Sequence, residues 1–296
     1  MTGKQVQGIY AALLTPRHQD NRVDPSGMSR LIEFLGQRGV RSYALNGATG
    51  EFCLTTPNEL RNSIRTVRDA AGERIDLLCG VGAAGVAASI ELAHIAQEEG
   101  AGVLLAPTPY FFPYQRDDVE AFFHTLASSV SLPIMLYNLP QFTTGLQVET
   151  VCSLIRDVPN IIGIKDSSGS LDILRALTQQ GISACRIIGN DGALVAALQE
   201  ELCDGVVSGV ACVLPELIQS VYSDQNSAQA RLLDEFIAQI DIFPTPWGLK
   251  WIAEARGIVQ ASFAQPVSAR RSSQSTRLIS WFQEWHASMP SHLAAK

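Results

Sequence analysis

Short runs of apolar and often β-branched residues recur along the whole chain, and longer segments with helical periodicity separate them. Each run is almost continuously apolar, which is typical of a parallel strand that is covered on both faces. The spacing between runs leaves room for one crossover helix each time. There are eight such runs: Gly8–Leu14, Ser42–Asn46, Asp76–Val81, Gly102–Ala106, Ile134–Tyr137, Ile161–Lys165, Arg186–Gly189 and Gly205–Ser208.

Start signals mark several of the intervening helices. Asp24 followed by Pro25 predicts an N-cap with proline in the first turn, and Thr56 to Glu59 has the form of a capping box. Residues 87–97 and 119–130 also carry helix-period patterns. Eight strand–helix units favour a closed (β/α)8 TIM barrel, an α/β fold, over an open sheet. We therefore predict a barrel domain over residues 1–215.

The strand pattern stops at Pro215, and only helical patterns continue to the end of the chain. Leu232–Ile242, Trp247–Arg256 and Thr276–Trp285 are the expected helices of this region. No linker separates them from the barrel. Residues 216–296 are therefore predicted to form a helical C-terminal extension that packs on the barrel.

Composition narrows the function classes. The 296 residues carry a formal net charge of −7, which disfavours a nucleic-acid partner, and no apolar run reaches the ~18 residues of a membrane span. The six cysteines are dispersed without metal or redox spacing, which fits a reducing cytoplasm. The five histidines also lack the spacing of a zinc site, so no metal is expected.

The most informative residue is Lys165, one of only four lysines, which ends the apolar run Ile161–Lys165. Active sites of (β/α)8 barrels lie where the strands end. A lysine ammonium is costly to bury, and a buried lysine that loses its proton is a nucleophile able to attack a ketone. Its position is equally compatible with a lysine at the barrel rim that pairs with Asp166.

Tyr137 ends the preceding run and is followed by Asn138. Neighbouring parallel strands lie ~4.8 Å apart, so Tyr137 and Lys165 can face one site if both point inward. A phenol beside an imine can transfer protons while the carbinolamine forms and collapses. Taken alone, Tyr137 also fits a core tyrosine whose hydroxyl bonds to the backbone.

The sequence Gly47-Ala48-Thr49-Gly50 follows the second run and predicts a flexible turn with a hydroxyl. Successive amides in such a turn can bind a carboxylate, and Thr49 can add a side-chain donor. Glycines that serve only the turn explain the pattern equally well.

Four ordered motifs then give a resemblance over nearly the whole chain. They are Gly47-Ala48-Thr49-Gly50-Glu51, Tyr137-Asn138-Leu139-Pro140, Gly163-Ile164-Lys165-Asp166 and Gly205-Val206-Val207-Ser208. With these motifs the chain resembles the dihydrodipicolinate synthase and N-acetylneuraminate lyase family, the pyruvate-dependent class I aldolases. The resemblance implies a TIM barrel with a helical extension, assembled as a homotetramer or homodimer.

The resemblance also implies roles for individual residues. Lys165 would form the Schiff base and Tyr137 would transfer protons. The turn with Gly47, Ala48 and Thr49 would hold the carboxylate of the 2-oxo acid. The remaining expected substrate-binding residues are Tyr110, Ser167, Gly189, Asp191, Val207 and Ser208.

This sequence departs from the family pattern at several of these positions. The first of two adjacent hydroxyl residues in the turn is Ala48, and Phe111 stands where a second tyrosine usually follows Tyr110. The synthase binds its second substrate with an arginine shortly after the Tyr-Asn-x-Pro motif, whereas this chain has Gln141 and Phe142. Neuraminate lyases carry an acidic residue where Gly192 stands.

We therefore predict a Schiff-base lyase, closer to a 2-keto-3-deoxy sugar acid aldolase than to the synthase. It would cleave such a sugar acid, or a related 4-hydroxy-2-oxo acid, to pyruvate and an aldehyde. The covalent imine on Lys165 would serve in place of a cofactor. Three alternatives stay open: a dehydratase of a keto-deoxy sugar acid, dihydrodipicolinate synthase, and a barrel that binds a 2-oxo acid without catalysis.

Overall fold

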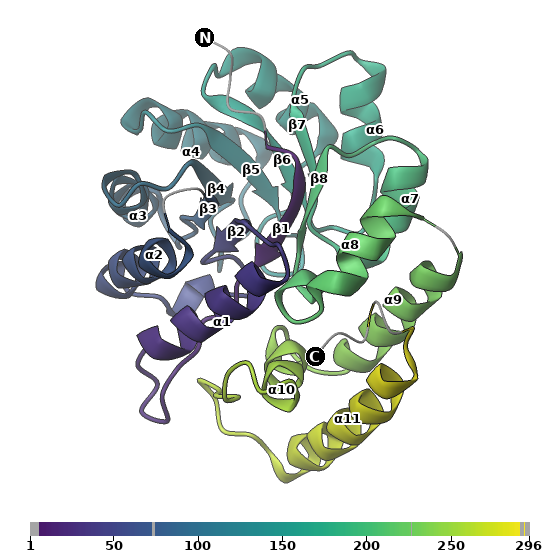
Figure 1. Cartoon of the computed structure of the whole chain (residues 1–296). Coiled ribbons are helices and arrows are strands. Elements are labelled where there is room, and N and C mark those ends of the chain that lie inside the picture. Colours follow the sequence, from purple (N-terminus) through teal and green to yellow (C-terminus); the bar gives the residue numbers. More distant parts are fainter. Residues whose placement is uncertain (1–5, 73–74, 226, 291–292, 294–296) are drawn as a thin grey trace.

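Eight parallel strands close into one barrel in the order β1 to β8, so each strand pairs with its neighbours in sequence and β8 pairs with β1 (Figure 1). The computed structural model describes residues 6–72, 75–225, 227–290 and 293. The strands are β1 Gly8–Ala12, β2 Ser42–Leu45, β3 Asp76–Gly80, β4 Val103–Pro107, β5 Ile134–Asn138, β6 Ile161–Asp166, β7 Cys185–Ile188 and β8 Gly205–Ser208. The predicted (β/α)8 barrel is confirmed.

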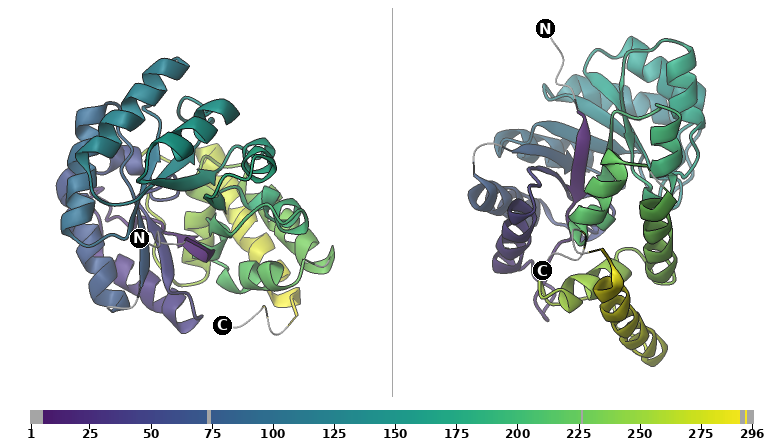
Figure 2. Two further views of the ribbon diagram at one scale, coloured as in Figure 1. Left: turned by 90° about the horizontal axis from the view of Figure 1, so that it is seen from above. Right: turned by 45° about the vertical axis from the view of Figure 1, so that its right-hand side comes forward.

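One helix follows each strand and covers the outside of the barrel (Figures 1 and 2). These helices are α1 Pro25–Gln37, α2 Pro57–Ala71, α3 Val86–Glu98, α4 Arg116–Ser129, α5 Val148–Asp157, α6 Asp172–Gln179, α7 Leu194–Gln199 and α8 Pro215–Ser223. The predicted capping box begins α2, since Glu59 N donates to Thr56 Oγ1 at 3.3 Å and Thr56 N donates to Glu59 Oε2 at 2.9 Å.

Two apolar layers follow from the alternation of side chains along each strand. One layer lies between the strands and the helices, and the other fills the barrel interior. The buried interior residues are Val6, Tyr10, Ala12, Ala44, Leu78, Val103, Leu105, Met135, Ile187 and Val207. The barrel is therefore packed below the level of the strand ends and is not a channel.

The chain continues beyond α8 into α9 Ser227–Ile240, α10 Trp247–Ala255 and α11 Ala269–Ser288, which confirms the helical extension (Figure 1). These helices gather at one end of the barrel (Figure 2). Residues of α9 and α10 share a cavity with residues that follow β6 and β7, so this end is the one where the strands terminate. A domain boundary at residue 215 stays a prediction; Pro215 is the first residue of α8.

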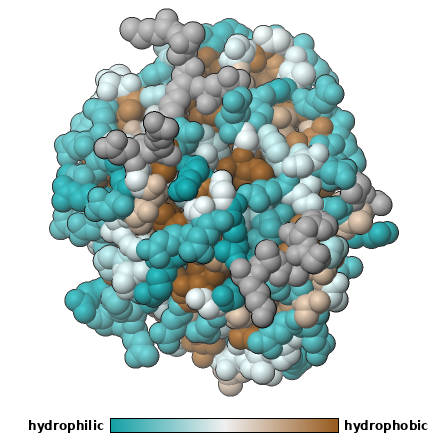
Figure 3. Space-filling view, viewed as in Figure 1, coloured by the Kyte–Doolittle hydropathy of each residue, from teal (hydrophilic) through white to brown (hydrophobic). Residues whose placement is uncertain are grey.

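The surface in Figure 3 is mainly hydrophilic, with hydrophobic residues in smaller separate areas. Within the described ranges, no helix combines the length and apolarity needed to cross a bilayer.

Candidate active site

A cavity of about 380 Å³ lies where the barrel strands end. Eight of the residues expected from the sequence line it: Ala48, Thr49, Tyr137, Lys165, Ser167, Gly189, Asp191 and Val207. They come from strands β5, β6 and β8 and from the segments after β2, β6 and β7. The barrel therefore brings together residues that are far apart in the sequence.

Lys165 is 3% exposed, and its side chain reaches the cavity rather than the barrel rim. Its Nζ lies 4.0 Å from the centre of the Tyr137 ring. Among the described residues, no carboxylate lies within ion-pair distance of this nitrogen and no group hydrogen-bonds to it. The amine is thus enclosed by protein yet open to a ligand on the cavity side.

Strand register explains why Tyr137 and Lys165 face each other. Tyr137 on β5 is directly opposite Lys165 on β6. Met135, two residues before Tyr137, belongs to the barrel interior, and residues two apart in a strand point to the same face. Tyr137 and Lys165 therefore continue the inward-facing rows of their strands, at the level where the apolar filling ends.

Asp166 does not pair with Lys165, so the alternative of a paired lysine at the rim is not observed. Its Oδ1 instead accepts hydrogen bonds from Asn138 Nδ2 at 3.0 Å and from Ser168 N at 2.8 Å. Burial raises the pKa of Asp166 in spite of these bonds. The hydrogen bond between Asn138 and Asp166 joins the ends of β5 and β6, directly after Tyr137 and Lys165.

Gly189 gives the Lys165 side chain the space that it occupies. A Cβ at this position would lie 2.6 Å from Lys165 Cε and 2.1 Å from Ser167 Oγ. Glycine is required by this close approach, since its φ is not in the left-handed region. The buried Ser167 Oγ has no hydrogen-bond partner among the described residues, so it is a candidate contact for a bound ligand.

The turn after β2 presents free backbone donors to the cavity. Ala48 and Thr49 line the cavity, and no acceptor for their amides is found in the described part of the chain. The left-handed conformation falls on Asn46 (φ 59°) and Glu51 (φ 55°), not on the two glycines of the turn. Two amides beside a threonine hydroxyl form a suitable site for a carboxylate.

Asp191 places a carboxyl group at the cavity, just after β7, in the single-turn helix η2 Asp191–Ala193. Its Oδ2 accepts a hydrogen bond from Val210 N at 3.1 Å, whereas the buried Oδ1 has no partner among the described residues. Burial raises the pKa of Asp191, although the Ser208 hydroxyl, the nearby amides and the charge of Lys165 act in the opposite direction.

Three expected residues lie close to the site without lining the cavity. Gly47 is buried, and its carbonyl accepts a hydrogen bond from Phe52 N at 3.2 Å. Tyr110 packs edge-on against Phe52, with ring centres 5.7 Å apart, in an apolar cluster that also contains Tyr137. Ser208 Oγ accepts a hydrogen bond from Ala211 N at 2.8 Å. From these positions the three residues can support the residues that line the cavity.

The far wall of the cavity comes from the extension, which sequence reasoning did not identify. The lining residues of this wall are Ile237, Ile240, Asp241, Phe243, Pro244, Thr245, Pro246, Gly248 and Leu249. They lie at the end of α9, in the connection to α10 and at the start of α10. Gln141, Phe142 and Asn190 also line the cavity. The helical pattern of the extension predicts which residues face the protein interior, but it does not predict that these residues lie across the cavity from the barrel strands.

Comparison with known proteins gives relatives along nearly the whole chain. The model of the Dihydrodipicolinate synthetase family matches residues 5–284. The 4-hydroxy-tetrahydrodipicolinate synthase of Methylococcus capsulatus is 30% identical over 273 residues, which cover 89% of this chain and 93% of the relative.

Two solved structures have folds similar to that of this chain. YagE, a prophage protein of the dihydrodipicolinic acid synthase family from E. coli K12 solved in complex with pyruvate, has a TM-score of 0.85 at 26% identity, covering 95% of this chain and 99% of that one. N-acetylneuraminate lyase from Mycoplasma synoviae has a TM-score of 0.81 at 18% identity, covering 94% and 97%, and supports the fold alone. With a family match over nearly its full length, the chain belongs to the dihydrodipicolinate synthase family of aldolase-type enzymes.

Proposed function

We propose that the chain is a Schiff-base aldolase that cleaves a 2-keto-3-deoxy sugar acid, or a related 4-hydroxy-2-oxo acid, to pyruvate and an aldehyde. The observation that carries this proposal is the Lys165 amine, which lines the cavity without an ion-pair partner among the described residues and lies 4.0 Å from the Tyr137 ring centre. A nucleophilic lysine requires an enclosed amine that a carbonyl can reach. The solved complex of YagE with pyruvate supports the choice of ligand.

The reaction begins when the uncharged Lys165 amine adds to the C2 carbonyl of the substrate. Tyr137 donates its phenolic proton to the departing hydroxyl, so water leaves and an iminium and a phenolate remain. The C3–C4 bond then breaks and its electron pair moves into the iminium, while the phenolate takes the proton of the 4-hydroxyl. The aldehyde departs, the enamine is protonated at C3, and hydrolysis releases pyruvate and the free amine.

The charges around the cavity favour a substrate that is anionic at one end only. The carboxylate at C1 would bind the Ala48 and Thr49 amides. At the far side the cavity is lined by Asp191 and Asp241, and Lys165 is the one lysine or arginine among its described lining residues. A second carboxylate would meet like charges there, whereas hydroxyl groups could hydrogen-bond to both aspartates.

Covalent trapping tests the proposal. Treatment with pyruvate and borohydride should reduce the imine and leave a stable adduct on the peptide that contains Lys165, detected by mass spectrometry. An unmodified Lys165 peptide under saturating pyruvate would refute the mechanism. Analysis of products from a panel of keto-deoxy sugar acids then separates aldol cleavage, which gives an aldehyde, from dehydration, which does not.

Dihydrodipicolinate synthase activity is the second candidate, because curated relatives such as the Methylococcus capsulatus protein carry that function in their names. The cavity argues against it. Gln141 and Phe142 line the region where the resemblance leads us to expect an arginine, and Gln141 Nε2 donates to Ser167 O at 3.1 Å. Loss of a guanidinium contact costs about 1.5–3 kcal/mol in binding. Turnover with pyruvate and aspartate semialdehyde at a rate above that with keto-deoxy acids would favour the synthase.

Assembly as a homotetramer or homodimer and a cytoplasmic location belong to the same proposal. Phe111 and Phe112 support an assembly, because they are 84% and 60% exposed and stack edge-on with ring centres 4.9 Å apart. Such aromatic pairs on a surface are typical of subunit contacts.

A further inference from the structure

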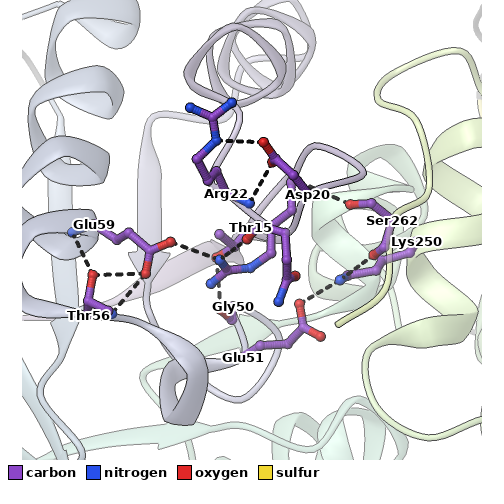
Figure 4. Close-up of polar contacts among 11 residues, drawn as sticks. Thr15, Asp20, Arg22, Gly50, Glu51, Thr56, Glu59, Lys250 and Ser262 are labelled. Carbon is purple, nitrogen blue, oxygen red and sulfur yellow. Dashed lines mark hydrogen bonds and ion pairs between the residues drawn. The ribbon is translucent and has the colours of Figure 1, made fainter. Parts of the chain in front are cut away.

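A second buried lysine lies close to the cavity, on the extension. Lys250 in α10 is 3% exposed, and its Nζ contacts Glu51 Oε2 at 2.5 Å and the Ser262 carbonyl at 2.7 Å (Figure 4). Glu51 is 8% exposed and follows the turn after β2. The pair joins segments that are 199 residues apart in the chain.

Glu51 is the residue that ends the turn, and its backbone is in the left-handed region (φ 55°). This conformation is unfavourable for a residue with a Cβ and persists only where the surroundings hold it. The ion pair supplies such a constraint, because a buried carboxylate separated from its partner would remain an uncompensated charge. The charge of Lys250 therefore helps to determine the backbone conformation at Glu51.

Glu51 is connected by a backbone hydrogen bond to the turn that lines the cavity. Glu51 N donates to Ala48 O at 3.0 Å. Thr15 Oγ1 donates to Gly50 O at 2.8 Å (Figure 4). The turn is thus fixed at its end by α10 and on one side by the segment after β1. Ala48 and Thr49, whose amides have no acceptor among the described residues, line the cavity.

We propose that Lys250 is a positioning residue for the reaction: through Glu51 it holds the turn in the conformation that binds the substrate carboxylate. This inference rests on the proposed function, which assigns that carboxylate to the turn. It also makes the extension a part of the binding site in two ways, as the far wall of the cavity and as the anchor of the turn on the near side.

The test compares two buried ion pairs, one made by Lys250 within α10 and the other by Arg256, the C-cap residue of α10. Lys250→Met removes one partner of the first pair. Arg256→Met removes one partner of the second, in which Arg256 Nη2 lies 2.7 Å from Glu216 Oε1 with side chains 5% and 9% exposed. Neither Arg256 nor Glu216 is among the residues that line the cavity. Arg256→Met is therefore a matched control for the general effect of breaking a buried pair.

The readout is the pyruvate concentration that gives half-maximal borohydride labelling of Lys165 in the full-length protein. Lys250→Met should raise this concentration at least ~10-fold while labelling at saturation still reaches completion, because the amine itself is unchanged. Arg256→Met should leave it within ~2-fold of the wild-type value. Equal values for Lys250→Met and the wild type, or equal increases in both variants, would overturn the inference.

Two further variants keep the test decisive if Lys250→Met does not fold. Lys250→Arg retains the positive charge and should recover most of the wild-type half-saturating concentration. Glu51→Gln retains the shape of the side chain and should raise the concentration as Lys250→Met does; a wild-type value would overturn the inference.

Experiments on the wild-type protein show separately whether the proposed function is wrong. Wild-type protein that binds pyruvate by calorimetry without being labelled refutes the imine mechanism, and the same variants can then be compared by their dissociation constants. Wild-type protein that does not bind pyruvate at all refutes both proposals.

Discussion

The protein buries two lysines at the same end of the barrel, and their surroundings differ in one respect. Lys165 and Lys250 are each 3% exposed. Lys250 contacts the Glu51 carboxylate at 2.5 Å, whereas Lys165 faces an aromatic ring and a cavity. Burial lowers the pKa of Lys250, although the Glu51 carboxylate acts in the opposite direction. The Lys250 nitrogen is occupied by its contacts with Glu51 and the Ser262 carbonyl, whereas the Lys165 nitrogen can be reached by a ligand in the cavity. Partnership, and not burial alone, therefore separates a lysine that maintains structure from one suited to chemistry.

The largest expected effect is the loss of activity in Lys165→Met. Without the amine no imine can form, so turnover should fall by at least ~10³-fold, the scale seen when a catalytic nucleophile is removed. Steady-state assays of pyruvate release measure the loss, and borohydride labelling should disappear with it. Labelling that persists in Lys165→Met would transfer the nucleophilic role to another lysine.

Lys250→Met should reduce stability more than Lys165→Met does, although Lys165→Met has the larger effect on activity. Lys250→Met leaves Glu51 buried without its partner and should lower the free energy of unfolding by about 3–5 kcal/mol. Lys165→Met removes an amine that has no ion pair among the described residues, so it should cost less than about 1 kcal/mol or raise stability. Urea unfolding of both variants measures the difference in the free energy of unfolding. Losses of similar size would contradict the view that Lys250 stabilises the fold more than Lys165 does.

The neighbour of the reactive lysine gives a third comparison. Tyr137→Phe keeps the ring beside Lys165 and removes only the hydroxyl, so pyruvate should still label Lys165 while turnover falls about 100-fold, the lower size of general acid–base effects. Rates of labelling and of pyruvate release are the two measurements. Near-normal release would assign proton transfer to a group other than Tyr137.

The smallest effect concerns Asp241, a cavity carboxylate for which no partner is found in the described residues. Partial burial raises the pKa of Asp241, so the folded protein retains the carboxyl proton to a higher pH than the unfolded chain does. The ionised group therefore reduces stability as the pH rises above its unfolded value of about 3.9. Asp241→Asn should add a few tenths of a kcal/mol at pH 7, because water screens this exposed site, and nothing below pH ~3.

Urea unfolding of Asp241→Asn at the two pH values measures this difference. A stability gain of the same size at both would show that the carboxylate charge is not its source.

Local rules allowed the central pair to be predicted from the sequence. Lys165 and Tyr137 end adjacent strands of a parallel barrel, and strand alternation then places both on the inner face. Gly189, Asp191 and Val207 were expected only from the family resemblance, and all three line the cavity.

The contacts across the site could not be predicted, because they join segments without a shared periodicity. Glu51 and Lys250 are separated by 199 residues, and nothing near either residue specifies the other. In the turn, Asn46 and Glu51 adopt the left-handed conformation and the two glycines do not, a choice on which the sequence made no prediction. Tertiary contacts, which a local pattern does not encode, determine that choice.

The Lys165 amine and the Tyr137 ring come from two barrel strands, whereas the far side of the cavity comes from helices that follow the barrel. Under the proposed aldol cleavage, bond chemistry and choice of aldehyde are thus encoded in separate stretches of the gene. Substitutions in the segment between α9 and α10 are then expected to alter which aldehyde is accepted while the strands that carry Lys165 and Tyr137 stay unchanged, which makes this segment the place at which to redirect specificity.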